Sequence, residues 1–339
     1  MEARIIGMKS SGKSTLMAAL AKGRTDGTVT TIRVGDERIR RLSQVFTPRK
    51  TTFAEFRVRE VAWPAASARK AQMERYLDQV AGAQVFIHVL RAFENPMLAE
   101  SADAQRDLQM LDSEFVFADL MLVERALERS RKQPLSNVGK TAFARCREAL
   151  EDERPLRHVE FGRQEADFLK TYQLLTLVPQ IIVVNLESDT VTSDGVPATL
   201  PEITQGRQVT GLPFPEAAEV AELSPAEQLD FAEAMGLPGT AADLISHAAF
   251  SQMGLISFFT VGEDEVRSWP IREGTRARQA AGAIHSDIER GFIRAEVVGY
   301  DTFMEAGSLK ACRENGTLRI EGKDYQVADG NIINYRFNV

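Results

Sequence analysis

The stretch "GMKSSGKST", residues 7–15, decides the fold of this chain. It follows a short apolar run, "ARII" (3–6), and leads into "LMAALA" (16–21), whose apolar residues continue without a turn signal. A strand, then a glycine-rich loop, then a helix is the order of a phosphate-binding βα unit. The sequence therefore predicts that the chain opens as an α/β domain.

The loop has the spacing G-x-x-x-x-G-K-[ST] of a phosphate-binding loop. Glycines let the backbone approach phosphate, and the N–H groups at the helix start supply positive potential. Lys13 can reach the β- and γ-phosphates, and the Ser14 hydroxyl can bind Mg²⁺. We predict a site for ATP or GTP with Mg²⁺. The alternative is a tight turn without a ligand. The predicted nucleotide-binding residues of the loop are Gly7, Lys9, Ser10, Ser11, Gly12, Lys13, Ser14 and Thr15.

Composition bounds the class of protein. A net charge of −7 over 339 residues argues against a uniformly basic surface, although a local basic face can still meet RNA. Two cysteines, Cys146 and Cys312, have neither disulfide-framework nor zinc-site spacing, which fits a reducing compartment. The N-terminus lacks a signal-peptide pattern, and no run of 18 apolar residues occurs. We expect a cytoplasmic protein with no membrane contact.

Two further apolar runs, "AQVFIHVLRAF" (83–93) and "VPQIIVVNL" (178–186), are apolar on both faces. This is typical of buried strands in a parallel sheet. Between them, charged segments with helical periodicity cover residues 108–132 and 138–154, separated by "QPLSN". The pattern predicts an antiparallel helical hairpin inserted between two strands of the sheet.

The rest of the chain differs in composition and in the pattern of its apolar residues. Residues 189–215 are rich in Gly, Pro, Thr and Asp, and we expect a loop or mobile insertion there. After residue 255, short strand-like runs alternate with Gly, Asp and Asn turns, which predicts a small mixed β domain. These runs are "ISFFTV", "GFIRAEVVGY", "TLRIEG", "KDYQVA" and "INYRFNV".

Several longer stretches carry a family resemblance, among them "GTRARQAAGAIHSDIERGFIRAEV" (274–297) and "EGKDYQVADGNIINYRFNV" (321–339). Together with "RAFEN" (91–95), "ADLMLVERALER" (118–129) and "LISFFTVGEDEVRSW" (255–269), they follow one another as in the YchF-type Obg-like ATPases. The chain resembles this family, a P-loop group of the translation-factor GTPase class, over nearly its whole length.

The resemblance implies a fold and a set of partners. The fold would be α/β, a GTPase-like and mostly parallel sheet with an inserted antiparallel coiled-coil arm and a C-terminal β-grasp domain of the TGS type. The nucleotide-binding domain would cover residues 1–95 and 156–254, the arm 96–155, and the TGS-like domain 255–339. The family resemblance also implies a purine nucleotide as ligand, the ribosome or RNA as partner, and a protein partner through the arm.

The nucleotide motifs of the family are kept unevenly. Lys9 and Ser10 replace its Pro-Asn pair within the loop, and the segment expected to hold switch I, residues 23–42, is short, with Thr30 or Thr31 as the magnesium-sensing threonine. Where the family has D-x-A-G, this chain has "EVAW" (60–63).

The "EVAW" stretch and the base motif bear on chemistry. Glu60 can still reach Mg²⁺, but Trp63 lacks the conformational freedom of glycine where a backbone N–H meets the γ-phosphate. The base motif N-x-x-E is matched by Asn185, while its fourth position is Ser188 and the carboxylate has moved to Glu187 or Asp189. We predict Ser14 and Glu60 as metal ligands and Asn185 and Glu187 as nucleotide contacts.

Three functions remain open at this point. The first is a nucleotide-dependent factor linked to translation or stress that hydrolyses ATP or GTP slowly, if at all. The second is a degenerate scaffold that binds RNA or protein through the arm and the TGS-like domain. The third is a small-molecule kinase, because P-loops also serve phosphate transfer to metabolites. Loss of switch contacts should lower the hydrolysis rate more than nucleotide binding.

Overall fold

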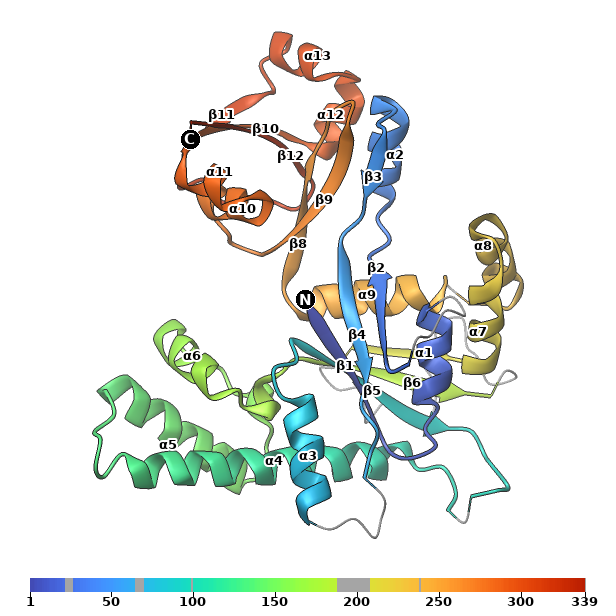
Figure 1. Ribbon diagram of the computed structural model, residues 1–339, viewed down its shortest axis with the longest axis vertical. Helices are drawn as coiled ribbons and strands as arrows, with labels where there is room; N and C mark the ends of the chain where they lie inside the picture. The colour runs from blue at the N-terminus through green and yellow to red at the C-terminus, as the bar shows by residue number, and fades with distance from the viewer. Residues whose placement is uncertain (22–26, 65–69, 99, 188–207, 238, 339) are drawn as a thin grey trace. The chain divides into compact units, whose positions relative to one another are not determined.

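The computed structural model describes residues 1–21, 27–64, 70–98, 100–187, 208–237 and 239–338 (Figure 1). The chain divides into two compact units. The P-loop unit contains Met1–Ile32 and Arg57–Ile245, and the C-terminal unit contains Arg33–Phe56 and Ser246–Val339. Among the helices described, none has the length and apolar character needed to cross a membrane.

The P-loop unit is built on a six-stranded sheet with the strand order β2-β4-β1-β5-β6-β7. Every pairing from β4 through β1, β5 and β6 to β7 is parallel, and β5 and β6 are buried almost throughout. This confirms the predicted α/β class with a mostly parallel sheet. In sheet order, the strands are β2 (Val29–Arg33), β4 (Glu55–Glu60), β1 (Glu2–Ile6), β5 (Val85–Ala92), β6 (Gln180–Leu186) and β7 (Gln208–Leu212).

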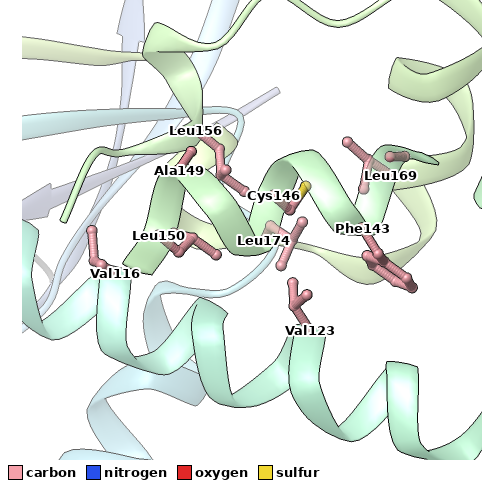
Figure 2. Close-up of a cluster of buried hydrophobic side chains, with 10 residues drawn as sticks. Val116, Val123, Phe143, Cys146, Ala149, Leu150, Leu156, Leu169 and Leu174 are labelled. Atoms are coloured by element: carbon pink, nitrogen blue, oxygen red, sulfur yellow. The ribbon is translucent and has the colours of Figure 1, made fainter. Parts of the chain in front are cut away.

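Helices connect these strands. Between β5 and β6, α4 and α5 form the predicted hairpin, whose apolar side chains interlock in one buried cluster (Figure 2). The helices of this unit are α1 (Lys13–Ala21), α3 (Lys70–Val80), α4 (Ala104–Arg129), α5 (Asn137–Glu151), α6 (Arg163–Leu169), α7 (Phe214–Glu222) and α8 (Pro225–Ala234), with the 3₁₀ turns η1 (Leu156–His158), η2 (Lys170–Tyr172) and η3 (Leu175–Leu177). Helix α9 (Ala241–Gln252) begins in this unit and ends in the other.

A buried carboxylate fastens the hairpin to the turn before β6. Asp119 of α4 accepts hydrogen bonds from the backbone N–H groups of Leu175 (2.9 Å) and Thr176 (2.7 Å) and from the Thr176 hydroxyl (2.6 Å). Burial raises the pKa of Asp119 to about 6, although these hydrogen bonds act in the opposite direction. The arm is therefore held by a carboxyl group whose burial is offset in part by three donors.

The C-terminal unit has a six-stranded mixed sheet, ordered β11-β10-β12-β8-β9-β3. Its strands are β3 (Lys50–Thr52), β8 (Leu255–Thr260), β9 (Glu265–Arg272), β10 (Phe292–Gly299), β11 (Arg319–Glu321) and β12 (Asn331–Phe337). Its helices are α2 (Glu37–Phe46), α10 (Ala277–Ile284), α11 (Ser286–Arg290), α12 (Tyr300–Ala306) and α13 (Leu309–Glu314). The predicted C-terminal β domain is thus present.

Residues 33–56 are an unexpected part of this unit, because the sequence predicts them as part of the N-terminal domain. β3 adds a parallel edge strand to β9, and α2 buries Ile39 and Leu42 in the same apolar cluster as Phe259. A three-residue strand beside a highly charged helix has too little apolar periodicity to reveal its partner, which lies about 200 residues away in sequence.

Two other expectations were wrong. "KDYQVA" (323–328) is no strand; Gln326 forms only an isolated bridge with Arg276, since neighbouring backbone groups bond the start of α10 instead. Of the expected loop 189–215, residues 188–207 lie outside the described part. Its end, however, forms β7 and the start of α7, because residues 208–212 pair in parallel with β6.

Candidate functional site

The loop between β1 and α1 adopts a conformation that requires its glycines. Gly7 and Gly12 have φ values of 146° and 101°, where residues with a Cβ are strained. A Cβ on Gly7 would lie 2.4 Å from the carbonyl oxygen of Val89, and one on Gly12 would lie 2.3 Å from Nδ2 of Asn185. Space and backbone both select glycine, so the loop has the curvature that a phosphate cradle needs.

Lys13, the first residue of α1, points back into this cradle. Its Nζ donates hydrogen bonds to the carbonyl oxygens of Gly7 (2.9 Å) and Met8 (2.7 Å), and only 6% of the residue is exposed. Burial lowers the pKa of Lys13 to about 8, and the charge of Glu60 partly offsets this effect. An ammonium group has three protons to donate, so the third remains for an anion.

Ser14 and Glu60 meet although 46 residues separate them. The Ser14 hydroxyl donates to Oε1 of Glu60 at 2.8 Å, which joins the first turn of α1 to the end of β4. The Glu60 N–H donates to the carbonyl oxygen of Thr28 at 2.8 Å. Thr28 is therefore the threonine that lies beside the proposed magnesium ligands. Thr30 and Thr31, the two expected candidates, lie inside β2. Hydroxyl and carboxylate oxygens are the ligands Mg²⁺ prefers.

The remaining loop residues have different surroundings. Lys9 and Ser10 are exposed, and Thr15 is half-buried in α1. Ser11 is 1% exposed, and its Oγ has no hydrogen-bond partner in the part of the chain that the structure describes. A buried hydroxyl without a partner is costly, so a ligand oxygen would satisfy it.

Asn185, at the carboxyl end of β6, links two loops. Its Nδ2 donates to the carbonyl oxygen of Ser11 (3.1 Å), and its Oδ1 accepts from the N–H of Phe214 (3.3 Å). Glu187 lies apart from these contacts, with Oε1 accepting the N–H of Glu94 at 3.0 Å. Ser188 and Asp189 lie outside the described residues. The structure therefore brings Asn185 into contact with the loop, while the hydrogen bond of Glu187 described here goes to Glu94.

Two residues near Asn185 were not among the predicted nucleotide contacts. The ring of Phe214 is fully buried, and its Cδ2 would lie 3.0 Å from a Cβ on Gly12, so it packs beneath the loop. Arg91 is aligned with Asn185 across β5 and β6, is 5% exposed, and donates from Nη2 to the carbonyl oxygen of Glu100 at 2.8 Å. A charged residue at the end of an apolar run was the available signal for Arg91.

Trp63 is partly buried and packs against an apolar cluster of the P-loop unit. Its ring meets Tyr76 of α3 edge to face, with centroids 5.0 Å apart, beside the buried Val61. A large side chain thus packs against the core directly after β4, where the expected motif has a glycine.

The residues fit a phosphate group in the cradle. Positive-φ glycines, a buried ammonium with a donor to spare and the orphaned Ser11 hydroxyl surround one concave backbone turn. Ser14 and Glu60 offer oxygen ligands for Mg²⁺ at its edge. No cluster of three or more His, Cys, Asp or Glu suited to a metal occurs among the residues described.

Comparison with known proteins finds relatives that cover nearly the whole chain. The family model YchF-GTPase_C, described as "Protein of unknown function (DUF933)", matches residues 255–338. "Ribosome-binding ATPase YchF" of Bacillus subtilis (strain 168) is 31% identical over 100% of both chains. "Obg-like ATPase 1" of Oryza sativa subsp. japonica is 32% identical over 99% of this chain and 91% of its own length. The solved "YchF GTPase" of Schizosaccharomyces pombe superposes with a TM-score of 0.87 at 25% identity, covering 99% of this chain and 97% of that one.

Proposed function

The chain belongs to the YchF family of Obg-like ATPases, and we propose on this premise that it binds ATP or GTP with Mg²⁺ at residues 7–15 and associates with the ribosome. The ribosome enters the proposal from the name of the Bacillus subtilis relative, "Ribosome-binding ATPase YchF". Hydrolysis would be slow or absent.

The observation that carries the nucleotide proposal is the state of Lys13. Lys13 is 6% exposed and its hydrogen bonds go to two neutral carbonyl oxygens, so the charge of Glu60 compensates its burial only in part. A phosphate in the cradle supplies the remaining charge and takes the third proton. Ser14 and Glu60 would hold Mg²⁺ together with phosphate oxygens, and the metal would neutralise charge that develops during phosphoryl transfer.

The same geometry argues for slow hydrolysis. Phosphoryl transfer depends on positioning and on groups aimed at the developing charge. Trp63 packs against an apolar cluster directly after β4, and the Glu60 carboxylate accepts a hydrogen bond from Ser14. Nucleotide binding would use the loop, whose motif is kept, whereas γ-phosphate sensing would use the position that Trp63 occupies.

The degenerate scaffold is the second candidate, and Trp63 is also the observation that favours it. In that case, the contacts of Asn185 with Ser11 and Phe214 serve to hold an empty loop together. The arm, proposed at residues 96–155, would then meet a protein partner. Its helix α4 exposes two large apolar side chains seven residues apart, Met110 at 49% and Phe117 at 63%.

Calorimetric titration with ATP and with GTP, each with Mg²⁺, tests the proposal against Lys13→Ala. The matched control is Lys140→Ala, because Lys140 is an exposed lysine of α5, outside the loop. Saturable binding that Lys13→Ala abolishes and Lys140→Ala keeps is the expected result. Phosphate release in the same samples separates a slow hydrolase from a sensor. Absence of binding to either nucleotide would leave the scaffold.

A further inference from the structure

A buried arginine at the carboxyl end of β5 lacks a counter-charge. Arg91 is 5% exposed, and its Nη2 donates to the carbonyl oxygen of Glu100 at 2.8 Å. Its Nη1 is buried without a hydrogen-bond partner, and no carboxylate among the described residues forms an ion pair with it. Burying a charge without an opposite charge is costly. The guanidinium group is therefore suited to an anionic ligand.

The alternation of side chains along β5 and β6 determines the side on which Arg91 lies. Leu90 and Val184 are aligned, and both pack with the start of α4 in one apolar cluster. Successive residues of a strand point to opposite faces, so the next aligned pair, Arg91 and Asn185, lies on the other face. Asn185 binds the carbonyl oxygen of Ser11 there, so Arg91 is on the side of the phosphate loop.

The strand order places Arg91 between the loop and Asn185. β5 lies between β1, which leads into the loop, and β6, which carries Asn185. Adjacent strands are about 4.8 Å apart, so Arg91 is one strand spacing from Asn185. On the other side, the carbonyl oxygen of Val89 would lie 2.4 Å from a Cβ on Gly7, the first glycine of the loop. A side chain as long as that of arginine is within reach of a ligand held by the loop.

The loop has a second unsatisfied group near β5. The Ser11 hydroxyl is buried and has no hydrogen-bond partner within the described ranges. The same Cβ on Gly7 that would meet Val89 would also lie 3.1 Å from Oγ of Ser11, so this hydroxyl is close to β5. Nη1 of Arg91 and Oγ of Ser11 are thus two buried donors without an acceptor at one edge of the sheet. Phosphate oxygens accept hydrogen bonds from both kinds of group.

We propose that Arg91 contacts phosphate in the nucleotide site, with Nη1 donating to a phosphate oxygen while Nη2 stays on the carbonyl oxygen of Glu100. The proposal rests on the nucleotide binding put forward above and extends it to a residue outside the loop motif. A guanidinium group has donors on both terminal nitrogens in a fixed plane, so it can hold the backbone and a ligand at once. A triphosphate carries enough negative charge to compensate both Arg91 and Lys13.

Replacement of Arg91 should change binding and stability in opposite directions. Arg91→Gln removes the charge, so the affinity for ATP with Mg²⁺ should fall about ten- to a hundredfold, the range for a hydrogen bond to a charged group. The melting temperature of the free protein should stay unchanged or rise, because a buried charge without a partner is gone. If Arg91 only held the Glu100 backbone, Arg91→Gln would lower the melting temperature and leave the affinity unchanged.

Two further variants serve as comparisons. Arg91→Lys keeps the charge but has no planar pair of donors, so it should recover part of the affinity. The matched control is Arg4→Gln, because Arg4 is 8% exposed on the adjacent β1 and donates from Nε to the carbonyl oxygen of Gln79 at 3.1 Å. Arg4 is aligned with Phe86, near the start of β5, and pairs with Glu2 at 2.8 Å. Arg4→Gln should keep the wild-type affinity and should not raise the melting temperature.

Tripolyphosphate identifies the part of the nucleotide that Arg91 holds. Calorimetric titrations with ATP and with tripolyphosphate, each with Mg²⁺, are made on the wild type and the three variants, beside thermal melting without ligand. Similar reductions for both ligands in Arg91→Gln, with none in Arg4→Gln, support the proposal. A reduction for ATP alone would assign Arg91 to the base or ribose and overturns it. So does a lower melting temperature with unchanged affinities.

The two ligands also separate this proposal from nucleotide binding itself. If the wild type binds tripolyphosphate but neither ATP nor GTP, the proposed function fails, and Arg91→Gln still decides whether Arg91 holds phosphate. If the wild type and Arg91→Gln bind ATP equally, the proposed function stands and the role of Arg91 is overturned. Binding of ATP without tripolyphosphate also overturns that role, because an uncompensated buried cation should accept a free anion. If no ligand binds, both proposals fail.

Discussion

The Ser14 hydroxyl lies 2.8 Å from Oε1 of Glu60, so the phosphate loop and the end of β4 share one hydrogen bond. This contact connects the phosphate loop, whose motif is kept, to the segment that begins at Glu60, where the family motif is altered. Both atoms are oxygen ligands that Mg²⁺ accepts, so a bound cation would take the place of this hydrogen bond and the hydroxyl proton would turn away from Glu60. The relationship makes Glu60 a residue whose effect should depend on magnesium.

Glu60→Gln should weaken nucleotide binding when Mg²⁺ is present and change it little when Mg²⁺ is removed with a chelator. The amide removes the negative charge but keeps the size of the side chain, so the expected reduction in affinity is about five- to tenfold. Isothermal titration with and without Mg²⁺ measures it. Glu55→Gln, on the same strand but paired with Arg33, should bind like wild type. Equal reductions with and without Mg²⁺ would assign Glu60 a structural role only.

The pKa of Lys13 predicts a pH dependence of nucleotide binding. With a pKa of about 8 in the free protein, Lys13 loses its proton as the pH rises past 8, although a lysine in the unfolded chain stays charged up to about 10.5. The phosphate-bound form keeps the proton, so the association constant should fall by up to about tenfold per pH unit above 8. The folding stability of the free protein depends on pH in the opposite direction. Because the unfolded chain binds more protons than the folded one between pH 8 and 10.5, the contribution of Lys13 to stability should rise as the pH increases through this range.

Titrations with ATP between pH 7 and 9.5 test this dependence. ATP is the suitable ligand because adenine has no group that titrates in this range, whereas guanine does. Lys140→Ala serves as the control, since it removes an exposed lysine of α5 outside the loop and should keep the wild-type profile. A flat profile for the wild type would show that the charge on Lys13 is not what holds phosphate.

The packing of Trp63 predicts that its replacement by glycine raises the rate of nucleotide hydrolysis but lowers the stability of the fold. Trp63→Gly restores the conformational freedom of the segment after β4, so phosphate release should rise severalfold, and it removes a ring packed on Tyr76, which should cost about 2 to 3 kcal/mol of stability. Trp63→Phe keeps most of the packing and should leave turnover low. Phosphate release and thermal melting, measured on both variants, check the two effects. Unchanged release in Trp63→Gly would place the defect elsewhere.

Local sequence was enough to predict the fold class, because its signals are strong. The loop spacing predicted β1 and α1, and apolar runs without alternation marked β5 and β6 as buried parallel strands. The helical hairpin followed from periodicity. The association of residues 33–56 with the C-terminal sheet was not predictable, since β3 contributes only three residues and its partner β9 starts at Glu265.

The site likewise has residues that the sequence predicted and residues that it did not. Lys13 and Ser14 were predicted because a phosphate loop is a contiguous motif, and their contacts follow from backbone geometry. Phe214 and Arg91 were not predicted as nucleotide contacts, because they reach the site only through the sheet order, which places β5, β6 and the start of α7 beside the loop. Long-range neighbours of this kind are set by topology and leave no local pattern.

Asp119 predicts a pH dependence of stability that is separate from the nucleotide site. Its pKa is about 6 in the folded chain against 3.8 in the reference state, so its contribution is fully present below pH 3.8 and is lost as the pH rises through 6. The full span corresponds to roughly 3 kcal/mol. Asp119→Asn removes the titration, so the stability difference between wild type and this variant should shrink from pH 5 to pH 7.5. Asp167→Asn is the control of opposite sign, because hydrogen bonding to Lys170 lowers the pKa of that exposed carboxyl. Denaturant unfolding at four or five pH values measures both differences.

A stability difference between wild type and Asp119→Asn that stays constant with pH would contradict the prediction. It would mean that the three hydrogen bonds keep the Asp119 carboxylate ionised across the range, so that the attachment of the arm does not depend on pH.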